Sequence, residues 1–201
     1  MARAPVFAEI YRNYLRELEG VDLAQRAGPL GAIFEDGTLL VPLYGRTYRV
    51  SATAITNPDG RDATPAVRVI LARYVLDCPE LPWGKADRLM SYREFPDAAP
   101  LISYFATNTN KTIETHFSGG LDRLRDSGRS LGAVEEHSAS HDLSLSFFAL
   151  PRIPVVLNFN DRDELFPAAC SVLYRQSAQY YLDMECLAMT GTLLASRLVG
   201  S

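Results

Sequence analysis

The sequence is poor in the residues that build disulfide scaffolds and metal knuckles, with 3 cysteines, 3 histidines and 1 tryptophan among 201 residues. Cys78, Cys170 and Cys186 are odd in number and widely spaced, so they form neither a disulfide framework nor a CxxC metal site. Isolated cysteines of this kind are typical of buried, reduced thiols. We therefore expect a cytoplasmic protein.

The chain also lacks long hydrophobic runs and an excess of positive charge. Its most apolar windows, such as residues 153–157, are far too short to span a bilayer. Residues 1–15 contain no uninterrupted apolar stretch of the kind a signal peptide requires. The net charge is −4, from 20 Lys and Arg against 24 Asp and Glu. We expect neither a membrane nor a nucleic acid as partner.

The composition is that of an ordinary globular protein, with 47% hydrophobic and 22% charged residues, which excludes disorder. No repeat, low-complexity tract or linker divides the sequence. We therefore expect residues 1–201 to form a single domain.

Hydrophobic periodicity predicts helices at both ends of the chain and strands between them. Helical spacing predicts long helices over residues 5–18, from Pro65 to Cys78, and after an N-cap at Asp183. Shorter helices are expected over 98–106 and 112–125, the second with a break or a close packing contact at its Gly-Gly pair. Residues 53–64 are expected to form an exposed loop.

Strands are predicted where short apolar runs are bounded by turn residues. The expected strands are residues 38–43, 46–51, 88–95, 143–149, 153–159 and 169–175. Tyr44-Gly45 is the expected hairpin turn between the first two. This order predicts an α+β fold, a mostly antiparallel sheet packed by the N- and C-terminal helices.

An acidic segment follows the predicted strand 153–159. Its candidate ligand-binding residues are Asp161, Asp163 and Glu164, since carboxylates after a strand bind Mg²⁺ or Ca²⁺ in many proteins. The glycine and the distal glutamate of an EF-hand are missing. The simpler interpretation is a solvated acidic turn that Arg162 neutralises.

A second candidate site lies at His137, His141 and Asp142. On a helix, the i, i+4 spacing would place both imidazoles on one face, as zinc sites require. The HExxH order is absent, and the surrounding serines indicate a loop with surface histidines. Nucleophile and phosphate motifs of the forms GxSxG and GxxxxGK[ST] are also absent.

Several short segments carry a family resemblance, in the order LYGRTY (43–48), SYREF (91–95), LPRIPV (150–155), DELFPA (163–168), SVLY (171–174) and YLDME (181–185). In this series the chain resembles the bacterial and archaeal family called domain of unknown function 3786, which recurs in anaerobes. The resemblance implies no established activity. Its motifs contain Arg152, Arg93 and Glu94, which join Asp163 and Glu164 as candidate ligand-binding residues, and Phe166 and Pro167, which would fix the acidic turn.

Some members of that family are labelled iron–sulfur proteins, through a separate cysteine-rich segment. Three scattered cysteines cannot supply four ligands, so we expect no iron–sulfur cluster and no other cofactor in this chain.

Three hypotheses follow. The first is a non-enzymatic binding or accessory module that acts with a redox or cofactor-dependent partner protein. The second is a small metal- or ligand-binding enzyme that uses the acidic turn in a concave pocket, with Arg152, Arg93 or His141 beside it. The third is self-association through residues 153–157 at a sheet edge.

Overall fold

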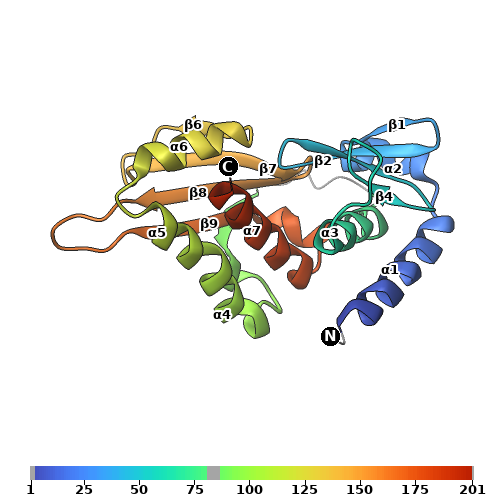
Figure 1. The fold of residues 1–201 in the computed structure, drawn as a ribbon, viewed down its shortest axis with the longest axis horizontal. Helices are drawn as coiled ribbons and strands as arrows, with labels where there is room; N and C mark the ends of the chain where they lie inside the picture. Colours follow the sequence, from blue (N-terminus) through green and yellow to red (C-terminus); the bar gives the residue numbers. More distant parts are fainter. Residues whose placement is uncertain (1–2, 81–86, 201) are drawn as a thin grey trace.

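The computed structural model describes residues 3–80 and 87–200, and Figure 1 shows their arrangement. Two antiparallel sheets lie towards opposite ends of the molecule, with helices packed against them. The fold is α+β, as the order of predicted elements indicated. One continuous set of buried hydrophobic residues runs from α1 to α7 and includes residues of both sheets.

The first sheet contains four strands in sequence order. Its strands are β1 (Ile33–Glu35), β2 (Thr38–Leu43), β3 (Arg46–Val50) and β4 (Ile55–Thr56). Tyr44 and Gly45 join β2 to β3 with φ values of 49° and 72°, the backbone of a two-residue hairpin turn. The segment 53–64, predicted as an exposed loop, instead contributes β4, because Ile55 and Ala63 are both buried.

The second sheet has five strands in the order β5-β9-β8-β7-β6. Its strands are β5 (Leu89–Ser91), β6 (Val134–Glu136), β7 (Leu143–Leu150), β8 (Ile153–Asn160) and β9 (Ala169–Arg175). Side chains of β8 alternate between buried and half-buried, so one face of the strand packs into the core. The hypothesis that residues 153–157 lie at a sheet edge is wrong, because β8 pairs with β7 and β9 on its two sides.

Helices cover the sheets as the periodicity predicted at the two ends of the chain. The main ones are α1 (Arg3–Glu19), α2 (Leu23–Leu30), α3 (Pro65–Leu76) and α7 (Met184–Val199). The Asp183 carboxylate caps α7 by accepting the N–H of Cys186. α1 packs on α3, whereas α7 packs on α3 and on the helical segments that lie between β5 and β6 in the sequence.

Between β5 and β6 of the second sheet, the predicted helices 98–106 and 112–125 are divided differently. One uninterrupted helical stretch contains η2 (Ala99–Leu101), α4 (Ile102–Phe105), the π-helical η3 (Ala106–Lys111) and α5 (Thr112–Phe117). A break at the Gly119-Gly120 pair follows, as predicted, and α6 (Leu121–Ser130) begins after it. The predicted strand 88–95 shortens to β5 followed by the 3-10 turn η1 (Tyr92–Glu94). No helix among the described residues is long and apolar enough to cross a bilayer.

Candidate functional site

The acidic segment forms the loop between β8 and β9, residues 161–168, which we call the tip. Figure 1 shows it as the orange loop that extends furthest from the second sheet. Leu165 and Phe166 are 82% and 67% exposed, although both are large hydrophobic residues. The predicted solvated acidic turn is therefore a turn that also presents two apolar side chains to solvent.

Asp163 holds the shape of the tip. Its Oδ1 accepts the backbone N–H groups of Leu165 and Phe166, both at 2.7 Å, and its own N–H donates to the Phe166 carbonyl at 3.0 Å. Side chains of Asp commonly stabilise turns in this way. The two donated hydrogen bonds also hold the pKa of the Asp163 carboxyl below its ordinary value, because they stabilise the charged form.

Asp161 fixes the base of the tip. Its Oδ1 accepts the N–H of Gly119 at 2.6 Å and of Arg162 at 2.7 Å. Its own N–H donates to Asp142 Oδ2 at 2.8 Å, so the structure brings together two of the sequence-predicted candidates. Gly119 has φ +73°, and the Arg162 guanidinium lies where a Cβ would project, so this close approach requires glycine.

The two histidines lie beside this base, in the connection from β6 to β7. His137 is exposed and His141 is half-buried, with its Nδ1 3.1 Å from Ser138 Oγ. They border a shallow hollow of about 320 Å³ that Asp142 also lines. Among the described residues, no three His, Cys, Asp or Glu side chains are grouped so that they could hold a metal ion.

Arg152 lies at the opposite end of β8 from the tip. The eight residues of β8 lie between Arg152 and Asp161, so their Cα atoms are nine strand steps, or roughly 30 Å, apart. Its guanidinium donates to the carbonyls of Pro29 and Gly28, both at 2.9 Å. Arg152 therefore joins the β7–β8 turn to α2 and does not converge with the acidic residues.

Arg93 and Glu94 lie in η1, after the edge strand β5. Glu94 Oε2 accepts the N–H of Ser91 at 2.7 Å and its hydroxyl at 2.8 Å, forming a capping box. These hydrogen bonds lower the pKa of Glu94. The Arg93 side chain is exposed.

The three cysteines are free and buried, as predicted. Burial raises the pKa values of the Cys170 and Cys186 thiols, since the thiolate loses its hydration. Both are therefore weak nucleophiles.

Sequence reasoning missed a basic hollow of about 670 Å³, lined by Arg46, Arg129 and Arg197. These residues come from the start of β3 and from the ends of α6 and α7. Arg46 belongs to the segment LYGRTY, which was a family signal, but nothing in the sequence linked that segment to the other two arginines.

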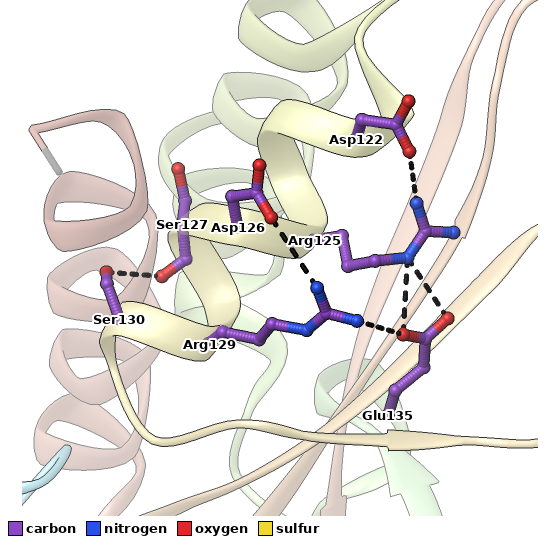
Figure 2. A network of polar contacts seen from close by, with 7 residues as sticks. All are labelled: Asp122, Arg125, Asp126, Ser127, Arg129, Ser130 and Glu135. Carbon is purple, nitrogen blue, oxygen red and sulfur yellow. Dashed lines mark hydrogen bonds and ion pairs between the residues drawn. The ribbon is translucent and has the colours of Figure 1, made fainter.

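Figure 2 shows how Arg129 is held. Its guanidinium lies 3.6 Å from Asp126 and 3.4 Å from Glu135, and Arg125 lies 3.2 Å from the same Glu135. Arg125 also pairs with Asp122. The network connects α6 to β6 along the side of the hollow.

The fold and the tip together define an α+β protein that presents a preformed acidic loop with an apolar end. Residues 22–197 match the family described as domain of unknown function (DUF3786), so the chain belongs to this family, as its motifs indicated. No curated protein and no solved structure matches the chain.

Proposed function

We propose that this protein is a non-enzymatic binding module that docks onto a partner protein through the tip. The observation that carries the proposal is the exposure of Leu165 and Phe166 on a turn whose backbone Asp163 already holds. A preformed turn loses little conformational entropy on binding. Burial of the two apolar side chains would then supply the favourable free energy.

The charges of the tip indicate what the partner surface looks like. Asp161, Asp163 and Glu164 add negative charge around the apolar pair, and Arg162 is the one cation of the loop. Complementary surfaces place opposite charges together. The partner that fits is a protein with an apolar pocket whose rim carries lysines or arginines.

The role that we propose for this contact is an accessory one, beside a redox or cofactor-dependent protein in the cytoplasm of an anaerobic bacterium. The class of partner rests on the iron–sulfur label of some members of the family; the family description itself names no function. The three buried, free thiols are consistent with a reducing compartment.

The alternative is a small metal- or ligand-binding enzyme that uses residues 161–164. Such an enzyme would need carboxylates directed into a pocket. Asp161 and Asp163 instead direct an oxygen at backbone N–H groups. The lowered pKa of Asp163 is that of a structural cap, whereas a general acid requires a raised pKa. The geometry thus favours docking.

Site-specific photo-crosslinking in the native host tests the proposal. A photoreactive amino acid at position 166 is expected to give one dominant adduct. The matched control is position 148, because Phe148 is 64% exposed and lies near the other end of the same sheet. Adducts that are identical at the two positions, or no adduct at 166, would exclude docking through the tip.

The purified partner then provides a quantitative test. Leu165→Ser and Phe166→Ser should each weaken its binding at least tenfold in calorimetry, while Phe148→Ser should leave it unchanged. The tip side chains are exposed, so these variants should fold normally, and a thermal melt confirms this.

A further inference from the structure

The basic hollow lies between the β2–β3 turn, the end of α7 and the segment after α6, away from the tip. Its volume of about 670 Å³ is in the range of small-molecule sites. Three arginines from three elements line it, and none of the described residues that line it is Asp or Glu. In a chain of net charge −4, this concentration of positive charge is a local exception.

Arg197 supplies the best-fixed positive charge. Its Nη1 donates to the carbonyls of Leu43 at 2.7 Å and Tyr44 at 3.4 Å, and its Nη2 donates to the Tyr48 hydroxyl at 2.8 Å. All three acceptors are neutral oxygens. Within the described part of the chain, no carboxylate forms an ion pair with Arg197, so its charge acts on the hollow.

Arg46 directly follows the β2–β3 turn, which is rigid. Tyr44 of this turn is buried and has a φ of 49°, a conformation that a bulky residue adopts only when its surroundings enforce it. The Tyr44 N–H donates to the Ala149 carbonyl and its hydroxyl donates to the Thr190 carbonyl, both at 3.0 Å. Arg46 itself is exposed and, among the described residues, has no carboxylate within ion-pair distance.

Arg129 completes the set. Its ion pairs with Asp126 and Glu135 are solvent-exposed (Figure 2), and exposed pairs of this kind contribute little free energy. An anionic ligand in the hollow can therefore replace these carboxylates as the partner of the Arg129 guanidinium at a small cost in free energy.

We propose that this hollow binds the phosphate group of a small phosphorylated molecule. Guanidinium groups bind phosphate and carboxylate through paired hydrogen bonds. Arginines from three directions favour the tetrahedral phosphate, whose terminal oxygens point in several directions, over the planar carboxylate. A neighbouring hollow of about 490 Å³ shares Ser130 with the first and provides room for the rest of the ligand; its charged and titratable lining residues are His116, Arg123 and Asp126.

Calorimetric titration with inorganic pyrophosphate tests this site, with citrate as the carboxylate counterpart. We expect a single pyrophosphate site, weaker binding of citrate, and weaker binding of both at higher salt. Arg46→Ala and Arg129→Ala should each reduce pyrophosphate affinity roughly tenfold, the loss of one charge-assisted interaction. Arg12→Ala is the matched control, because it removes an exposed arginine of α1 and the same unit of charge.

Three results would overturn the proposal. They are no heat of pyrophosphate binding, an equal loss of affinity in Arg12→Ala and Arg46→Ala, or citrate binding at least as tightly as pyrophosphate. Thermal melts of each variant establish that the fold is intact. Leu165→Ser should bind pyrophosphate normally, so this test is independent of docking through the tip.

Discussion

Asp163 is the residue on which the geometry of the tip depends. A single carboxylate oxygen accepts two successive backbone N–H groups and so sets the direction in which Leu165 and Phe166 project. The side chain is exposed, and its role is therefore to order the loop rather than to stabilise the whole protein. Its ionisation state should decide whether the loop keeps this shape.

An NMR titration of the protein checks this role. We expect the Asp163 carboxyl to titrate below its ordinary value of 3.8, and the amide signals of Leu165 and Phe166 to shift at the same midpoint. The pKa of Asp163 is lower in the folded protein than its ordinary value. The stabilisation of the tip by the carboxylate is therefore complete above the ordinary pKa and is lost as the pH falls through the folded pKa.

The matched variant for this titration is Asp163→Asn, which keeps an acceptor oxygen but does not ionise. Its tip amides should not move over the same pH interval. A midpoint at or above 3.8 in the native protein would contradict the cap.

At the scale of elements, the π-helical segment η3 departs from α-helical geometry within the helical stretch 99–117. It packs against α7 where Gly191 allows close approach: a Cβ at that position would lie 2.4 Å from a ring carbon of Phe105 and 3.0 Å from Thr109 Oγ1. The Thr109 side chain is fully buried, and its hydroxyl has no hydrogen-bond partner among the residues that the structure describes. Such a group destabilises the folded state.

Thr109→Val should therefore raise the free energy of unfolding by about 1 kcal/mol, because the shape is kept and the unpaired hydroxyl is removed. The control is Thr190→Val. Thr190 is equally buried, but its hydroxyl donates to the Leu187 carbonyl at 2.7 Å and lies 3.0 Å from the Tyr174 hydroxyl. Thr190→Val should lower the free energy of unfolding, measured by urea denaturation, by about 1–3 kcal/mol. Equal losses in both variants would contradict the difference between the two sites.

The elements that the sequence predicted well are those with a clear hydrophobic pattern. The strands around Tyr44-Gly45, the strand 169–175 and the helix after Asp183 all have a buried face that dictates their period. β6 was missed because its three residues are exposed, and it is held by backbone pairing with β7 and by the ion pairs of Glu135 with α6 rather than by a buried apolar face. Residues 107–111 were not predicted as helical because the Thr and Asn residues among them have low helix propensity, and packing on α7 overrides that preference.

At the scale of the whole molecule, Arg152 connects the two halves. It anchors the β7–β8 turn of the second sheet to the carbonyls at the end of α2, and its N–H donates to the hydroxyl of Tyr74 at 3.1 Å. That hydroxyl in turn donates to the Leu30 carbonyl at 2.7 Å. The family motif around Arg152 therefore describes a structural joint.

Arg152→Ala should lower the free energy of unfolding by about 1 kcal/mol, through the loss of two charge-assisted hydrogen bonds on an exposed side chain. Arg93→Ala, at an exposed arginine, should stay within about 0.5 kcal/mol of the native protein. Urea denaturation of both variants measures the difference. A larger loss for Arg93→Ala would show that the joint is elsewhere.

The distance along the chain between grouped residues explains which parts of the candidate sites could be predicted from the sequence. Neighbouring residues such as Asp161 and Asp163 were found because they are close in the chain. The contact between Asp142 and Asp161 depends on the pairing of β7 with β8, and the basic hollow depends on three elements far apart in the sequence. Such groupings follow from tertiary packing, which local patterns do not encode.

The hydrogen bond from Tyr44 to Thr190 also has a consequence for synthesis. The two residues are 146 positions apart. At a translation rate of about 5–20 residues per second, roughly 7–30 s pass between the synthesis of the two residues. During that interval the β2–β3 turn of the nascent chain lacks its hydrogen bond to α7. Chaperones and proteases can therefore act on the turn before this contact forms.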